Sequence, residues 1–285
     1  MPELPEVETV ARGVDARVRG DRIVDVWLGS HKQPFKTPAV KQAKDLEGRT
    51  ILGVARVGKH IVMSLGGIAQ GKPLKKDVKR EDVTAQWIVH LGMTGRLLVT
   101  TPEAEIAPHT HARLTLHSGK EIRFVDPRRF GRLEFRELSK SSGFEAPGAE
   151  PLRIEAEAFA ALFKGRKLAI KAALLNQSLL AGVGNIYADE SLNRAGIRPR
   201  RRAGALTRKE LEQLRVALSE VLTQAIKLGG SSVSDYVDAN GVKGFFQLEH
   251  RVYQRTGEPC RTCKTSIRRI VVAGRSTHYC PTCQK

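Results

Sequence analysis

Three things are scarce in this sequence: long apolar runs, cysteine and acidic residues. No apolar run approaches the ~20 residues of a membrane-spanning helix, which excludes a transmembrane helix. No signal peptide precedes the first helical pattern, so we expect a soluble, cytoplasmic protein. The body of the chain cannot contain a disulfide, because all four cysteines fall in the tail that begins at Cys260.

Acidic residues are too few to balance the basic ones. Asp and Glu total 30 against 48 Lys and Arg, which gives a net charge of +18 and a pI near 10.1. A charge of this size favours a polyanionic partner, and nucleic acid is the default. A merely soluble basic surface is the alternative. The densest run holds four arginines and suits phosphate groups, but equally a solvated loop: Arg198, Arg200, Arg201 and Arg202.

The cysteines follow the pattern C-x2-C-x16-C-x2-C at Cys260, Cys263, Cys280 and Cys283. This spacing is typical of one structural zinc ion held by four thiolates, and a metal explains how so short a tail folds. Disulfides are the alternative, but a reducing cytosol disfavours them. Between the pairs, residues 267–273 and 277–279 predict a β-hairpin whose tip, 274–276, carries an arginine.

The chain opens with Met1-Pro2-Glu3. Methionine is normally removed before a residue as small as proline, which would leave a secondary amine at Pro2. An α-amino group (pKa ~8) is neutral at pH 7 roughly a hundredfold more often than a lysine (pKa ~10.4). Pro2 is therefore a candidate nucleophile toward a sugar C1′, and Glu3 a candidate for proton transfer. Alternatively, Pro2 and Pro5 merely open an amphipathic helix, whose apolar stripe is Leu4, Val7, Ala11, Val14 and Val18.

The hydrophobic period changes once along the 285 residues, which predicts two domains. Short strands are predicted in the first half, at 23–28, 51–57, 61–65, 112–116 and 122–125, and favour a sandwich or barrel. We expect the polar, lysine-rich stretch 66–84 to be disordered. After a linker near 141–151, helices are predicted at 159–163, 168–175, 186–192 and 211–226.

Two glycines precede the third of these helices. Gly182 and Gly184 allow tight backbone turns, and Asn185 is placed to cap the helix. The free N–H groups at such a helix start form a natural phosphate site. A plain helical hairpin is the alternative.

Five motifs occur in one order along the chain: PELPE (2–6), HLGMTG (90–95), DPRRFG (126–131), AGVGNIYADE (181–190) and the cysteine tail. Together they resemble the formamidopyrimidine-DNA glycosylase family of bacteria, which excises 8-oxoguanine and ring-opened purines. The resemblance covers nearly the whole length.

The resemblance implies an α+β fold of two domains with DNA in the cleft between them. The N-terminal catalytic domain (1–140) would be a β-sandwich flanked by helices. A linker (141–153) would lead to a helix–two-turn–helix DNA-binding domain (154–247). A zinc-finger β-hairpin (248–285) would follow and hold one Zn²⁺.

The resemblance also implies roles in catalysis. Pro2 would be the Schiff-base nucleophile and Glu3 its proton-transfer partner. Lys59 would bind a phosphate beside the lesion, and Asn185 and Arg275 would grip the DNA backbone.

Four further residues would act on the distorted DNA. Met93, Arg128 and Phe130 would fill the hole that the extruded base leaves, and Arg128 would donate to the orphaned cytosine. His90, in the second motif, would also bind DNA.

The implied activity is that of a bifunctional glycosylase and AP lyase on double-stranded DNA containing oxidised purines, with β,δ-elimination. We expect a monomer in the bacterial cytoplasm, associated with the nucleoid. Two alternatives stay open: an endonuclease VIII-like enzyme for oxidised pyrimidines, and a non-catalytic zinc-finger protein that binds damaged DNA.

Three features depart from the family pattern. The stretch 66–84 is longer than expected, and Asn176 stands where aspartate is expected. Residues 231–246 resemble a loop that closes over the flipped base, and such loops vary.

Overall fold

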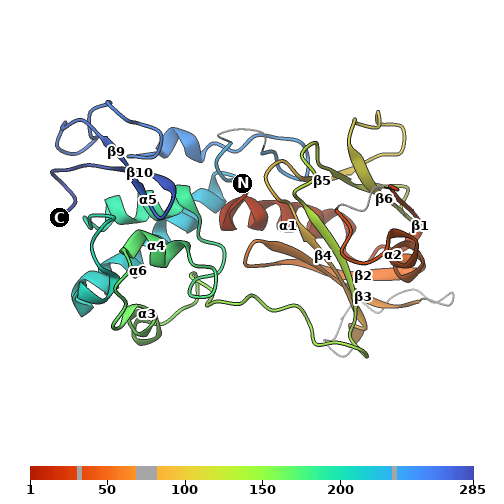
Figure 1. Cartoon of the computed structure of the whole chain (residues 1–285). Helices are drawn as coiled ribbons and strands as arrows, with labels where there is room; N and C mark the ends of the chain where they lie inside the picture. The colour runs from red at the N-terminus through yellow and green to blue at the C-terminus, as the bar shows by residue number, and fades with distance from the viewer. Residues whose placement is uncertain (31–33, 69–81, 233–235) are drawn as a thin grey trace. The chain divides into compact units, whose positions relative to one another are not determined.

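A computed structural model describes residues 1–30, 34–68, 82–232 and 236–285 (Figure 1). The chain forms two units, neither of which is continuous in sequence. The first consists of Met1–Pro2, Glu6–Glu145 and Ser231–Gly244, and the second of Glu3–Pro5, Ala146–Gly230 and Phe245–Lys285. Residues 69–81 of the stretch for which we expect disorder lie outside the described residues.

The first unit contains two antiparallel four-stranded sheets. One has the order β1-β6-β7-β5, formed by Ile23–Leu28, Thr110–Leu116, Glu121–Val125 and Arg96–Thr100. The other has the order β2-β3-β4-β8, formed by Arg49–Val57, His60–Ile68, Ala85–His90 and Arg132–Glu137. A short helix, α2 (Ala39–Leu46), accompanies them. The sandwich predicted from the sequence is confirmed.

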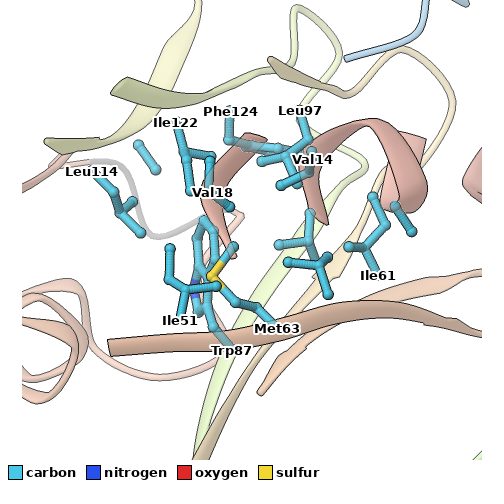
Figure 2. Close-up of a cluster of buried hydrophobic side chains, with 14 of the residues drawn as sticks. Val14, Val18, Ile51, Ile61, Met63, Trp87, Leu97, Leu114, Ile122 and Phe124 are labelled. Carbon is cyan, nitrogen blue, oxygen red and sulfur yellow. The ribbon is translucent and has the colours of Figure 1, made fainter. Parts of the chain in front are cut away.

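The helix α1 (Leu4–Val18) supplies the apolar stripe predicted for it. Its Val14 and Val18 pack with side chains from both sheets, such as Trp87 of β4 and Phe124 of β7, and all four are fully buried (Figure 2). Burying each such side chain contributes roughly 1.5–3 kcal/mol. This core fixes the direction of α1 within the first unit from Glu6 onward.

The sequence pattern does not predict β4, β5, β8 or α2. β4 is buried along nearly its whole length, so it lacks the alternation that marks a half-exposed strand. β3 also runs through 66–68, where disorder was expected, and that part of the expectation is wrong. The Thr84 N–H donates to the Leu65 carbonyl, which ties the far side of the stretch to the same strand.

The second unit is helical, with a C-terminal hairpin. Its helices are α3 (Ala156–Phe163), α4 (Ile170–Leu175), α5 (Asn185–Arg194) and α6 (Arg208–Lys227), and the predicted helices are confirmed. Thr207 and Glu210 form a capping box at the start of α6. Two 3-10 turns lie at Ala203–Ala205 and Phe246–Glu249. None of the helices formed by the described residues has both the length and the apolar character that a membrane crossing requires.

The hairpin consists of β9 (Arg268–Val272) and β10 (Arg275–Tyr279). Its two-residue turn is Ala273-Gly274, and both residues have positive φ, at 48° and 72°. Such a turn matches the twist of the flanking strands. The expectation that Arg275 lies at the tip is therefore wrong by one residue: Arg275 is exposed, opens β10 and pairs with Val272.

Candidate functional site

The N-terminal segment is buried directly after its first residue. Met1 is half-exposed, Pro2 is buried, and Glu3 is only 4% exposed. The Glu3 carboxylate accepts hydrogen bonds from two backbone N–H groups at the start of α5, those of Ile186 (3.0 Å) and Tyr187 (3.4 Å). The positive end of a helix favours a negative charge. Glu3 is thus held by its own carboxylate, and Pro2 precedes it by one peptide bond.

The two glycines before α5 make room for this segment. A Cβ on Gly184 would lie 2.2 Å from Cδ of Glu3, and one on Gly182 would lie 2.9 Å from Cβ of Leu4. The Leu4 N–H donates to the Gly182 carbonyl (3.0 Å). The sequence predicts a phosphate at this helix start, but the N–H groups of Ile186 and Tyr187 bind Glu3 instead.

Asn185 does not cap α5 with its side chain. Gly184 is the N-cap, and Asn185 is the first helical residue, so the capping prediction is wrong. Nδ2 of Asn185 instead donates to the carbonyl of Ser276 (2.9 Å), the residue after Arg275. This bond brings together the two residues that the resemblance pairs as backbone grips.

A buried ion pair supports the same hairpin. Nζ of Lys171 lies 2.7 Å from Oδ1 of Asp189, and both side chains are fully buried. Lys171 also donates to the Ser276 carbonyl and to Oγ1 of Thr277, each at 2.9 Å. The other Asp189 oxygen accepts from the His278 N–H (2.8 Å). Burial lowers the pKa of Lys171, although Asp189 opposes the shift.

Two more polar residues of α5 hold the zinc-finger segment. Both carboxylate oxygens of Glu190 are used, accepting hydrogen bonds from three consecutive N–H groups at 251–253, and burial raises the pKa of this carboxyl group. Asn193 donates to Oε1 of Gln284, which also accepts from the Cys280 N–H. Sequence reasoning assigned no role to these residues. They could have been found as polar side chains on a helix that is buried on all sides, because such side chains need partners.

The four cysteines form one compact cluster. Their sulfur atoms all lie within 4.8 Å of one another, and the sulfur pairs Cys260–Cys283 and Cys263–Cys280 lie 3.9 and 3.4 Å apart. Tetrahedral zinc with Zn–S bonds of about 2.3 Å requires sulfur separations of about 3.8 Å. The donor set and its spacing fit one structural Zn²⁺ ion, as the sequence predicts.

In the first unit, two loops present large exposed side chains. Met93, between β4 and β5, is 40% exposed, and Phe130, between β7 and β8, is 48% exposed. The guanidinium of Arg128 lies over the Phe130 ring, 4.9 Å from its centroid. Because Met93 and Phe130 are exposed on loops, they are better suited to insert between DNA bases as a wedge than to fill a hydrophobic core.

The two loops are held together by a buried bond. Oγ1 of Thr94 donates to Oδ1 of Asp126 (2.6 Å), and Oδ2 of Asp126 accepts from the Gly131 N–H (2.7 Å). Gly92 has a φ of +65°, and a Cβ there would lie 2.5 Å from the Gly131 nitrogen. From the sequence these residues had no role beyond membership of the motifs HLGMTG and DPRRFG, and the structure shows that they position Met93 and Phe130.

Lys59 lies in the turn between β2 and β3. The side chain of Arg56 braces this turn, because it contacts both the Gly58 carbonyl (3.3 Å) and Glu8 of α1 (2.7 Å). Glu8 is the fifth residue of α1. The first unit therefore ties the lysine turn to the N-terminal end of α1.

His90 lies beside a cavity of about 290 Å³ whose other charged or titratable lining residues are Lys36, His60, Arg132 and Glu134. Burial lowers the pKa of His90, and the charges of Lys59, Arg132 and Lys36 lower it further. Nδ1 accepts from the Gly92 N–H (3.2 Å). The neutral ring therefore carries its proton on Nε2, where it can donate.

Family comparisons match three consecutive parts of the chain. The formamidopyrimidine-DNA glycosylase N-terminal domain matches residues 1–133, its H2TH domain matches 147–237, and a zinc finger found in FPG and IleRS matches 257–285. The chain belongs to the formamidopyrimidine-DNA glycosylase family. The resemblance seen in the five motifs is confirmed.

Relatives in this family match over their full length. The formamidopyrimidine-DNA glycosylase of Solibacter usitatus is 46% identical over 285 residues, with 100% of both chains covered. That of Thermus thermophilus is 43% identical, with 100% of this chain and 98% of the relative covered. The fold also matches a Lactococcus lactis FPG mutant in complex with DNA containing Fapy-dG, with a TM-score of 0.86, 33% identity and full coverage of both chains.

The formamidopyrimidine-DNA glycosylase fold thus brings the expected residues together in groups. In the first unit, Lys59 lies near His90, and the loops of Met93 and Phe130 are joined. In the second unit, Asn185 lies beside the start of β10, where Arg275 is exposed.

Proposed function

We propose that this chain is a bifunctional DNA glycosylase and AP lyase that removes oxidised purines, 8-oxoguanine and formamidopyrimidines, from double-stranded DNA. Family membership supports the reaction class. The observation that carries the mechanism is the N-terminal segment: Pro2 precedes Glu3, whose carboxylate two α5 N–H groups hold in place.

The reaction begins with the amine of Pro2 after removal of Met1. The amine attacks C1′ of the damaged nucleotide, the N-glycosidic bond breaks, and the base leaves with a proton. The amine loses its own proton once it is bonded to C1′. Its nitrogen lone pair then expels the ring oxygen: the C1′–O4′ bond breaks, O4′ takes up a proton, and an iminium ion remains. Glu3 takes up and returns these protons, because its carboxylate is anchored one residue from the nucleophile.

The iminium ion then drives strand cleavage. It acidifies the C2′ proton, and loss of that proton expels the 3′-phosphate. A second elimination expels the 5′-phosphate and leaves a gap of one nucleoside. The same covalent intermediate thus serves both the glycosylase and the lyase activities.

The target base must leave the stack before the amine reaches C1′, which costs a few kcal/mol. Met93 and Phe130 are exposed on joined loops and take the space that the base vacates. Arg128, held over the Phe130 ring, donates to the acceptor groups of the orphaned cytosine.

Phosphate binding is divided among four residues. Lys59 offers an ammonium group, and His90 offers an Nε2–H within a basic environment. Asn185 and Arg275 contribute from either side of the Ser276 carbonyl. We further propose that the protein acts as a monomer on nucleoid DNA in the bacterial cytoplasm; the relatives that it matches come from bacteria.

Borohydride trapping tests the mechanism directly. The protein is incubated with an 8-oxoguanine:C duplex and sodium borohydride, and the adduct is located by mass spectrometry. We expect a covalent adduct on Pro2. A variant extended by one residue before Pro2 is expected to bind DNA but to form no adduct. An adduct on a lysine contradicts the Pro2 mechanism, and binding without any adduct supports the non-catalytic alternative.

Oxidised pyrimidines are a second candidate substrate. A related Lactococcus lactis FPG, 33% identical with a TM-score of 0.85, has been solved with DNA containing an oxidised pyrimidine. A cleavage assay that compares 8-oxoguanine:C with thymine glycol:A duplexes separates the two substrates. We expect faster cleavage of 8-oxoguanine:C, and the reverse order would favour an endonuclease VIII-like activity.

A further inference from the structure

Two arginines of the run at 198–202 contact the zinc finger of the same unit. The Arg198 guanidinium lies 6.0 Å from the centroid of the Tyr279 ring, and its Nη2 donates to the Pro281 carbonyl (2.9 Å). Nη2 of Arg200 donates to the Val271 carbonyl (3.3 Å). The run is therefore a loop attached to the finger.

The hairpin adds two arginines of its own. Arg268 and Arg269 are exposed at the start of β9, and they pair in register with Tyr279 and His278. Arg198 and Arg268 thus both neighbour Tyr279, whereas Arg269, the next residue of the strand, points to the opposite face of the hairpin. We call the four residues Arg198, Arg200, Arg268 and Arg269 the finger arginines.

These four charges are not neutralised within the part of the chain that the structure describes. All four residues are exposed, and none forms a salt bridge with a described carboxylate. Arg201, in the same run, differs because it pairs with Glu210. Unpaired like charges on one short hairpin and its attached loop repel one another, and a bound anion would relieve that repulsion.

We infer that the finger arginines bind backbone phosphates of duplex DNA beyond the phosphates held by Asn185 and Arg275. The inference rests on the proposed function. Guanidinium groups suit phosphate because they donate two parallel hydrogen bonds. Arg275 opens β10 and Tyr279 closes it, so the strand joins the proposed grip to the finger arginines. Five residues of strand span about 14 Å, which corresponds to about four phosphates along one DNA strand.

The test compares two double variants with a matched control. Arg198→Gln/Arg200→Gln and Arg268→Gln/Arg269→Gln each remove two charges and keep an amide donor. Lys164→Gln/Lys167→Gln removes two exposed charges directly after α3 of the same unit, and neither lysine forms a salt bridge with a described carboxylate. Zinc content and circular dichroism check that each variant is folded.

Affinity is measured against salt concentration on two lesion duplexes, one of about one helical turn and one of about three turns, or roughly 11 and 32 base pairs. On the long duplex we expect the slope of log K against log salt to fall by about 0.9 for each arginine removed, or about 1.8 for each double variant. The short duplex and the control should show little change. Excision from the short duplex should equal that of the unmodified protein.

Several results would overturn the inference. If the slope on the long duplex is unchanged and excision is intact, the finger arginines do not bind DNA phosphates, and the proposed function still stands. An equal loss in the control shows that only overall charge matters. Unchanged DNA binding together with lost binding of a polyglutamate peptide assigns the surface to an acidic protein segment. Failure of the unmodified protein to excise the lesion from either duplex contradicts the proposed function itself, which is a different result.

Discussion

At the scale of single residues, the candidate site depends on space as much as on charge. Glu3 reaches the α5 N–H groups only because residue 184 has no side chain, since a Cβ there would lie 2.2 Å from Cδ of Glu3. The Glu3 carboxylate that this Cβ would meet is held by the N–H groups of Ile186 and Tyr187, so it has little freedom to move aside. Gly184 therefore positions the Glu3 carboxylate, and through it the proposed proton transfer.

We expect Gly184→Ala to displace the Glu3 carboxylate and to slow base excision by about 10²-fold or more, the usual scale for losing a positioned acid–base group. Lesion affinity should change only a few-fold. Single-turnover excision and binding are measured side by side. Gly67→Ala is the control, because a Cβ there meets nothing within 4 Å. Wild-type excision by Gly184→Ala would show that Glu3 does not need this position.

His60 makes the first unit sensitive to acid. Burial lowers its pKa to about 4, and the neighbouring His90 contributes. The folded pKa lies below the unfolded value of about 6.5, so the unfolded chain takes up the proton first, and stability falls as the pH drops from about 6.5 toward 4.

We expect His60→Phe, which keeps a ring between His90 and Phe144, to reduce this acid sensitivity. Urea unfolding at pH 7.5 and pH 5 gives the free energy of unfolding for both proteins. The difference between the two pH values should be smaller in the variant. The exposed His117→Phe serves as the control, and an equal pH dependence in wild type and His60→Phe would contradict the prediction.

At the scale of elements, α5 is the organising helix of the second unit. Its side chains hold the hairpin through Asn185 and Asp189 and the segment before the finger through Glu190. Each of these bonds links residues more than sixty positions apart. A helix that carries so many buried polar groups is specified by its partners rather than by its own periodicity.

We expect Lys171→Met to destabilise the protein by about 3–5 kcal/mol, because the buried carboxylate of Asp189 would lose the cation that balances its charge. The double variant Lys171→Met/Asp189→Leu should recover much of that loss. Urea unfolding of the single and double variants measures the free energies of unfolding. A double variant less stable than the single one would show that hydrogen bonds to the hairpin, rather than the charge, dominate.

Elements with a local sequence signal could be predicted, whereas contacts between distant segments could not. Local signals predicted α1, the later helices and the cysteine cluster, because helical periodicity and the spacing of metal ligands can both be recognised within a short stretch of sequence. β4 was missed because both of its faces are buried. The side-chain roles of Asn185 and Asp189 could not be predicted from local sequence, since their partners lie at 276 and 278. Only the family resemblance indicated that these distant segments meet.

At the scale of the whole molecule, a net charge of +18 and the proposed phosphate grips act together. The general charge attracts any DNA, whereas we propose that Asn185 and Arg275 hold particular phosphates. We expect Arg275→Ala to weaken lesion binding and to lower the slope of log K against log salt by about 0.9. The neutral Asn185→Ala should weaken binding with a smaller change in slope. Titrations over a range of salt concentrations check both, and an unchanged slope for Arg275→Ala would count against its phosphate role.

Zinc removal separates the contributions of the two units. The cysteine cluster supports the hairpin, and Arg275 is the first residue of its second strand, β10. Chelation of the zinc should therefore unfold the finger and abolish tight lesion binding. The first unit should keep its core, and its state can be followed alone, because both tryptophans of the chain, Trp27 and Trp87, belong to it. We expect unchanged tryptophan emission, reduced circular dichroism of the finger and recovery of binding when zinc is restored. Retention of full lesion affinity after complete zinc loss would show that the DNA grip does not require a folded finger.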